Sequence, residues 1–308
     1  MIYLFFILIS SCIIQTRLLN KQKKRINVVF AINNKYIDNI ISCLFSLYEH
    51  SDKNSIYDIY VQVNDKFESK NIRLIYELEK KFFNCFIHII NMGEEYKRNI
   101  AGSIDTSTYY RLKLPVLLPK ERRIIHIDTD STILKDLIEL YTLNFNQNYI
   151  LGRLDLIVNE LDALGIYTKT YINCGVLLMD LYSLRKYNYV EKFNNYLKKN
   201  NNYKYLNHHD QTLINYVCHD KIGIFRPRYH MWPFKHNYDI IRFNERLRTK
   251  YNINEFIEDY QDPYIVHFPG HFKRKEYLNS SHFYHIYNRY LNKAKDYKKQ
   301  VNVTNILC

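Results

Sequence analysis

Glycine is scarce in this sequence, which has seven glycines among 308 residues. No G-x-G-x-x-G follows an apolar run, so a dinucleotide-binding dehydrogenase is not predicted, and the glycine pattern of a P-loop is missing as well. Proline and tryptophan are also rare, and none of the six cysteines forms a C-x-x-C pair. The cysteines therefore predict no metal cluster. Their neighbours are mostly apolar, which favours small core residues and leaves one disulfide open.

Acidic residues are outnumbered, with 31 Asp and Glu against 44 Lys and Arg, and the formal net charge is +13. Such a balance raises the question of nucleic acid, because clustered basic side chains neutralise phosphates. Here the basic blocks are confined to 21–25 and 273–275, and Tyr, Asn, Ile and Phe are abundant beside Lys. We read this as a compositional bias with scattered, solvated lysines and expect no nucleic-acid partner. A polyanion site is the alternative.

An apolar run opens the chain. Residues 2–14 are interrupted only by Tyr, Ser and Cys and are followed by the basic residues of 21–25. A membrane span needs about 20 apolar residues, so residues 1–24 are predicted to be a signal peptide, or a short membrane anchor, with a basic stem. We therefore expect a location in the secretory pathway, in the lumen or membrane of the endoplasmic reticulum or Golgi. The alternative is a hydrophobic N-terminal strand or helix.

Short apolar runs alternate with helical spacing through the first half of the chain. Strands are predicted at 26–32, 56–63, 86–90 and 123–127, and helices at 36–48, 68–83 and 106–118. This alternation predicts a parallel sheet with helices on its faces. In the less regular second half, strands are predicted at 149–155, 175–180 and 264–268, and helices at 184–199, 210–218 and 283–298. We expect one α/β domain over residues 25–298, with a mixed, mostly parallel sheet flanked by helices, and a tail at 299–308.

The triplet Asp128-Thr129-Asp130 directly follows the strand predicted at 123–127. Sheets of this kind bind ligands at the carboxyl ends of their strands. Two carboxylates one residue apart can hold one divalent cation, and Mn²⁺ or Mg²⁺ prefers oxygen ligands and leaves room for a diphosphate. The residues that follow, 132–141, are predicted to be helical with Ser131 as the N-cap. Taken alone, the triplet could equally be a turn with two solvated acids.

Six segments accompany the triplet in a fixed order. They are VVFAINNKY at 28–36, STYYRLKLPVLLP at 107–119, RIIHIDTDSTILKDL at 123–137, YINCGVLLMDL at 171–181, HDQTLIN at 209–215 and VHFPGHFK at 266–273. Together they resemble glycosyltransferase family 8, the retaining, nucleotide-sugar-using group that includes glycogenin and bacterial lipopolysaccharide galactosyl- and glucosyltransferases. The likeness runs over roughly 26–273. It implies a single Rossmann-like GT-A domain and a glycosyltransferase.

The resemblance also implies a role for each matching residue. The metal ligands would be Asp128, Asp130 and His267, with Mn²⁺ or Mg²⁺ as the cofactor. The donor-binding residues would be Ala31, Asn33, Tyr36, Arg111, Asp128, Asn173, Gly270 and Lys273. Asp155 would contact the sugar or the acceptor, and Gln211 and Asp210 would be the catalytic pair. Considered singly, His267 could be a core histidine and Lys273 a member of a solvated basic cluster.

The implied reaction is the transfer of glucose, galactose or xylose from a UDP-sugar to a glycan or glycoprotein acceptor, with retention of configuration. Retaining glycosidases use a carboxylate nucleophile, but here the amide of Gln211 is expected beneath the sugar. Attack by the acceptor on the face that the diphosphate leaves is therefore favoured over a double displacement through Gln211 or Asp210. Two alternatives stay open, a catalytically silent binder of sugar nucleotides or polyanions and a glycogenin-like protein that glucosylates its own tyrosine. The sequence does not determine the oligomeric state.

Three positions depart from the family pattern. Lys273-Arg274-Lys275 stands where the family commonly has Lys-Pro-Trp, which puts the local acceptor contacts in doubt. Asn33 is an amide where many bacterial members have an acid, and it can still hydrogen-bond a nucleotide. His230 stands where an asparagine is more usual, and we expect its effect on the acceptor side.

Overall fold

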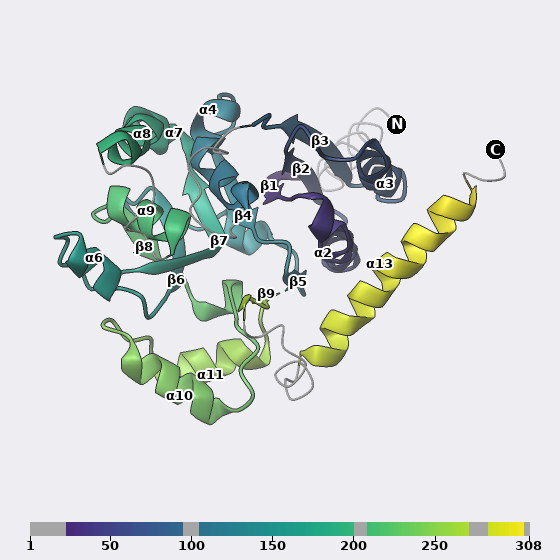
Figure 1. The fold of residues 1–308 in the computed structure, drawn as a ribbon. Helices are drawn as coiled ribbons and strands as arrows, with labels where there is room; N and C mark the ends of the chain where they lie inside the picture. The colour runs from purple at the N-terminus through teal and green to yellow at the C-terminus, as the bar shows by residue number, and fades with distance from the viewer. Residues whose placement is uncertain (1–22, 95–104, 200–207, 271–282, 305–308) are drawn as a thin grey trace, which may run out of the picture.

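The computed structural model describes residues 23–94, 105–199, 208–270 and 283–304. Residues 1–22, which carry most of the predicted leader, and Lys273 lie outside the described residues. No helix within the described ranges is both long enough and apolar enough to cross a membrane. The described residues form a central sheet covered by helices, with a helical lobe below it made of α10 (Asn237–Arg246) and α11 (Ile253–Gln261) (Figure 1).

The first half of the sheet folds as the alternation predicts. Its elements are β1 (Lys24–Ala31), η1 (Asn34–Tyr36), α2 (Ile37–His50), β2 (Ser55–Val63), α3 (Ser69–Glu79) and β3 (Cys85–Asn91). β1 pairs with β2 and β2 with β3, both in parallel. Ile40 and Leu44 of α2 are spaced by one helical turn and are buried against the strands, and Ile75 of α3 is buried in the same core. The buried positions of these strands are mostly apolar, as expected of a sheet covered by helices, with polar exceptions such as Asp58 and Gln62 of β2.

The second half of the sheet contains one strand that runs in the opposite direction. Its strands are β4 (Arg123–Ile127), β6 (Ile150–Leu154), β7 (Ile172–Asp180) and β8 (Ile222–Ile224), and the seven-stranded order is β3-β2-β1-β4-β7-β6-β8. β4 is parallel to β1 and β8 to β6, whereas β7 is antiparallel to both β4 and β6. The predicted mixed, mostly parallel sheet is confirmed. Because β7 runs in the opposite direction, its first residues lie at the same end of the sheet as the last residues of β4 and β6.

The prediction of a helix at 132–141 is wrong over its first half. Ser131 does not cap a helix but begins β5 (Ser131–Ile133), which pairs antiparallel with β9 (Ile265–His267), and only α5 (Ile138–Tyr141) is helical. The β-branched Thr132 and Ile133 are buried in this two-stranded sheet, a setting that suits their side chains. The pairing partner comes from the far end of the domain, so the local pattern could not reveal the strand.

Two other predicted helices are divided. The one at 106–118 is a 3-10 helix, η3 (Thr106–Lys113), followed by the short α4 (Leu114–Leu117). The one at 184–199 is split into α7 (Leu181–Lys186) and α8 (Tyr189–Lys199) at Asn188, whose φ of 54° is left-handed and cannot continue a helix.

The remaining elements complete the second half of the domain and cover the core. They are α6 (Asn159–Ala163), α9 (His209–Val217), η4 (Pro227–Tyr229) and α13 (Tyr284–Thr304). α13 runs along α2, where Tyr290 and Tyr297 are buried (Figure 1). The helices α10 and α11 were not predicted, because α10 for example buries only Ile240 and Phe243 as apolar residues. The described cysteines are buried and free, as expected of small core residues; they are Cys43, Cys85, Cys174 and Cys218.

Candidate active site

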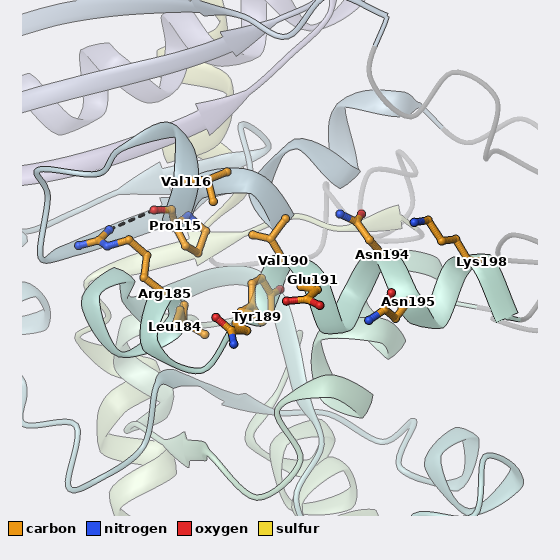
Figure 2. Close-up of a pocket in the computed structure, with 11 residues that line it drawn as sticks. Pro115, Val116, Leu184, Arg185, Tyr189, Val190, Glu191, Asn194, Asn195 and Lys198 are labelled. Carbon is orange, nitrogen blue, oxygen red and sulfur yellow. Dashed lines mark hydrogen bonds between the residues drawn. The ribbon is translucent and has the colours of Figure 1, made fainter.

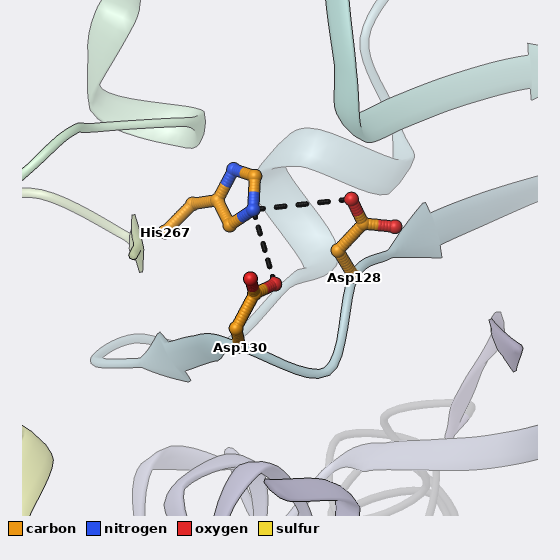
Figure 3. A group of neighbouring side chains, drawn as sticks. All are labelled: Asp128, Asp130 and His267. Carbon is orange, nitrogen blue, oxygen red and sulfur yellow. Dashed lines mark hydrogen bonds and ion pairs between the residues drawn. The ribbon is translucent and has the colours of Figure 1, made fainter. Parts of the chain in front are cut away.

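Asp128 and Asp130 lie in the turn between β4 and β5, and His267 ends β9 opposite them (Figure 3). Nε2 of His267 lies 3.1 Å from Oδ1 of Asp130 and 3.8 Å from Oδ2 of Asp128. One ligand atom from each residue lies within 4.8 Å of the others. The imidazole is buried while the carboxylates are partly open to solvent. Two carboxylate oxygens and one imidazole nitrogen at this spacing fit a divalent cation such as Mn²⁺.

Gly175 of β7 lies directly against the ring of His267. A Cβ on Gly175 would lie 2.2 Å from Cε1 and 2.4 Å from Nδ1 of that imidazole. The carbonyl of Gly175 also accepts a hydrogen bond from the amide of Asp128 at 2.7 Å. A glycine inside a strand often marks such a close approach. The glycine therefore makes room for the histidine that faces the two carboxylates.

His230 contacts the other ring nitrogen of His267. Its Nε2 lies 2.8 Å from Nδ1 of His267, and both rings are buried. The backbone fixes this contact, because Met231 bridges to Val266 and the amide of His267 donates to the carbonyl of Met231. Burial, together with His267 and Arg153, holds the pKa of His230 well below its usual range. The structure thus places His230 against a candidate metal ligand, whereas the sequence analysis expected it to affect the acceptor side.

Arg111 connects the turn after β4 to α9. Its Nη2 lies 3.3 Å from Oδ1 of Asp128, its Nε lies 3.0 Å from Oδ2 of Asp210, and it donates to the carbonyl of Cys174. Burial opposes the charge of the guanidinium, but Asp210 and Asp128 outweigh it and raise the pKa of Arg111. Burial raises the pKa of Asp210 to about 6, although Arg111 acts in the opposite direction. Arg111 and Asp210 are buried, and the partly exposed Asp128 completes this group of three neighbouring charges.

Gln211 and Asn173 converge on Asp155. Oε1 of Gln211 accepts the amide of Cys174 at 3.1 Å, and its Nε2 lies 3.4 Å from Oδ2 of Asp155. Nδ2 of Asn173 donates to the same Oδ2 at 2.8 Å. The start of β7, the end of β6 and the first turn of α9 are therefore joined by side chains. All three residues lie at the end of the sheet where β4 finishes and Asp128 follows.

A cleft of about 140 Å³ opens beside the two aspartates. Its lining residues are Ala31, Tyr36, Asp105, Ser107, Thr108, Arg111, Asp128, Thr129 and Asp130. Asn33 does not line this cleft. Its side-chain oxygen accepts a hydrogen bond from the backbone amide of Lys35 at 2.8 Å and caps η1. Gly270 follows β9, is exposed, and has a φ of 46° that glycine adopts without strain.

A larger pocket of about 580 Å³ lies between α4, α7 and α8 (Figure 2). Arg185 at one end of this pocket donates to the carbonyl of Pro115, Lys198 lies at the other end, and Glu191 lies between them. None of the predicted site residues lines it. The chemistry of the lining, rather than the size of the pocket, therefore identifies the cleft at Asp128 as the candidate site.

The family model of glycosyl transferase family 8 matches residues 27–274. The chain belongs to glycosyltransferase family 8. It is 25% identical over 250 residues to General stress protein A of Bacillus subtilis, covering 79% of this chain and 85% of that protein. It is 24% identical over 300 residues to a Lipopolysaccharide 1,2-glucosyltransferase of Escherichia coli, covering 91% of this chain and 83% of that protein. Family 8 membership makes the chain a transferase enzyme.

A solved glycosyltransferase structure supports the fold. The galactosyltransferase LgtC, solved in complex with donor and acceptor sugar analogs, superposes with a TM-score of 0.68 at 16% identity, covering 87% of this chain and 96% of LgtC. The predicted GT-A fold is confirmed. At this identity the likeness concerns the fold alone.

The predicted location in the secretory pathway is wrong. The relatives of this family 8 chain come from Bacillus subtilis, Haemophilus influenzae and Escherichia coli, and bacteria have neither endoplasmic reticulum nor Golgi. The prediction depended on the apolar run at 2–14, and a run of that length is ambiguous because buried strands and helices share its composition.

Sequence reasoning missed three features around the site. Gly175 was noted as part of a motif without a physical reason, although an isolated glycine in an apolar strand signals a close approach. The contact between His230 and His267 left no local signal. Close to Gln211, the carboxylate of Glu160 accepts a hydrogen bond from the hydroxyl of Thr212. The same carboxylate contacts Nδ1 of His208, just before α9, and raises the pKa of that histidine. Only the packing of α6 against α9 brings these residues together.

Proposed function

We propose that this family 8 enzyme transfers a hexosyl or pentosyl residue (glucose, galactose or xylose) from a UDP-sugar to a glycan or protein acceptor, with retention of configuration and dependence on Mn²⁺ or Mg²⁺. The observation that carries the proposal is the approach of His267, from the far end of the domain, to both Asp128 and Asp130 at the edge of the cleft. Ala31 and Tyr36 line the same cleft, where the uracil and ribose would be held.

The donor diphosphate would lie between the metal-ligand group (Asp128, Asp130 and His267) and Arg111. When bound, a divalent cation would supply Lewis-acid stabilisation of the negative charge that develops on the departing UDP. Arg111 is held on one side by Asp128 and on the other by Asp210, so its guanidinium is fixed in place before the donor arrives. Lys273 and the amide of Gly270 would complete the diphosphate contacts. Lys273 lies outside the described residues.

The sugar and the acceptor would lie beside the cleft, near Asn173, Asp155 and Gln211, at the end of the sheet where β4 and β6 end and β7 begins. These side chains are joined by the contacts on Asp155, so their polar atoms are oriented in advance. Asp210 is 6% exposed and faces Arg111, and Gln211 carries an amide, which is a weak nucleophile. Both observations favour attack by the acceptor on the face that the diphosphate leaves.

The test is metal-dependent release of UDP. The full chain is incubated with Mn²⁺ and, separately, with UDP-glucose, UDP-galactose and UDP-xylose, and slow UDP release is expected from one of them. Removal of the metal with EDTA should stop the release and added Mn²⁺ should restore it. Asp130→Ala should abolish it, whereas Asp220→Ala, which changes an exposed carboxylate after α9, should not.

Each outcome of this assay decides something different. If no UDP-sugar is bound or hydrolysed with metal dependence, the proposed activity fails. Tight metal-dependent binding without turnover, even with acceptors added, would instead identify a silent binder. A gain of one sugar in the intact mass of the protein would identify a self-glycosylating enzyme.

A further inference from the structure

His230 and His267 share a single hydrogen between two nitrogens. Nε2 of His230 and Nδ1 of His267 are 2.8 Å apart, with ring centroids at 5.0 Å and an angle of 37° between the planes. Two neutral imidazoles at this distance form one hydrogen bond, and only one of the facing nitrogens carries the hydrogen. The tautomer of His267 is therefore coupled to that of His230.

A metal ion at Asp128 and Asp130 selects one polarity for this hydrogen bond. To bind a cation, Nε2 of His267 must present its lone pair, so the hydrogen of the neutral ring must sit on Nδ1 and must be donated. The acceptor within reach of Nδ1 is Nε2 of His230. His230 then carries its own hydrogen on Nδ1, an atom that has no hydrogen-bond partner among the described residues.

With a neutral His267 ring, the metal-free contact requires the opposite polarity. For Nε2 of His267 to donate to Oδ1 of Asp130 across 3.1 Å, that nitrogen must carry the hydrogen, and Nδ1 must then accept from His230. An imidazole at position 230 serves both states without moving a heavy atom, because its Nε2 is a donor in one tautomer and an acceptor in the other.

We propose that His230 is a positioning residue for the metal site, and that it orients His267 and selects the tautomer in which Nε2 is available as a ligand. This inference rests on the metal site of the proposed function. Besides the contacts of its Nε2 with Asp130 and Asp128, the ring of His267 contacts His230 through Nδ1 and lies directly against Gly175. Without an acceptor at position 230, the buried Nδ1–H of His267 would have no hydrogen-bond acceptor in the metal-bound state, and that state would be disfavoured.

The experiment measures the affinity for Mn²⁺ alone, by the electron paramagnetic resonance signal of free Mn²⁺ during titration of the full chain. His230→Leu should weaken Mn²⁺ binding by roughly 10- to 100-fold, the usual effect of losing such a partner. His230→Gln can place an amide oxygen or nitrogen near the original Nε2, so we expect it to restore affinity to within about threefold of the native chain. Leu78→Ala, a buried truncation in α3, controls for general loosening of the fold and should lower stability without changing the affinity.

The possible results separate this inference from the proposed function. If the native chain does not bind Mn²⁺, the metal site itself is refuted and the role of His230 with it. If the native chain binds but His230→Leu binds within twofold of it, the metal site stands and the positioning role is refuted. The role is also refuted if His230→Gln binds as weakly as His230→Leu, because the effect would then come from lost packing and not from the hydrogen bond.

Discussion

Replacement of Gly175 by alanine should displace His267 from the metal site while leaving the sheet folded. The new Cβ would lie 2.2 Å from Cε1 of His267, and an ordinary carbon–carbon contact is about 3.5 Å, so the ring must retreat by about 1.3 Å. His267 is buried and hydrogen-bonded to His230, so this movement breaks existing contacts. We expect a loss of about 1–3 kcal/mol in the free energy of unfolding.

The effect on metal binding should be larger than the effect on stability suggests. A ligand that is displaced by about 1 Å no longer presents Nε2 to both carboxylates, and we expect roughly 10- to 100-fold weaker Mn²⁺ binding. Urea unfolding without metal and Mn²⁺ titration measure the two effects separately. Gly223→Ala is the matched control for the steric clash. Its Cβ would meet the side chains of Leu151 and Asn148 at 2.5 and 2.7 Å, but Gly223 lies in β8, the outermost strand of the sheet.

A double-mutant cycle provides the result that would refute this reasoning. In a His267→Ala background the obstructing ring is gone, so Gly175→Ala should then cost less than about 0.5 kcal/mol. An undiminished cost in that background would show that the clash is not with His267. Native Mn²⁺ affinity in Gly175→Ala would refute the link between the glycine and the metal site.

Two further predictions concern the buried charges beside the cleft. Arg111→Met should destabilise the fold by about 3–5 kcal/mol in urea unfolding, because it leaves Asp210 and Asp128 without their shared cation; adding Asp210→Asn should recover part of this loss, and no recovery would show that the charges are not coupled. The pKa of Asp210, about 6 in the folded state, lies above its unfolded value near 3.9, so the folded state keeps this proton longer and stability falls as the pH rises from about 4 to 6. Asp210→Asn should therefore gain on the order of 2–3 kcal/mol relative to the native chain between pH 4 and 7, and a constant difference across that range would contradict the raised pKa.

The sheet was predictable because its signals are local. The strands β1 to β4 are mostly apolar, and β4 has the predicted bounds of Arg123–Ile127. The position of Asp128 at the end of a strand followed directly from that pattern. The prediction failed once because of a distant pairing and once because of a single backbone conformation. Residues 131–133 form a strand because β9 pairs with them, and the predicted helix at 184–199 is broken by a left-handed backbone at Asn188.

The candidate site was recognisable as a set of residue types, since Asp128, Asp130 and His267 match a family motif. The sequence could not show what holds His267 in place. That depends on the pairing of Ser131 with His267, on the missing side chain of Gly175, and on the contact with His230.

The sequence by itself determined the α/β class, the family and the residues of the candidate metal site, because apolar periodicity and short motifs depend on neighbouring residues. Only the tertiary structure decided how the imidazole of His267 is aimed. The sequence does not distinguish its two ring nitrogens. The structure does, because Asp130 lies 3.1 Å from Nε2, on the side of the candidate metal site, and His230 lies 2.8 Å from Nδ1.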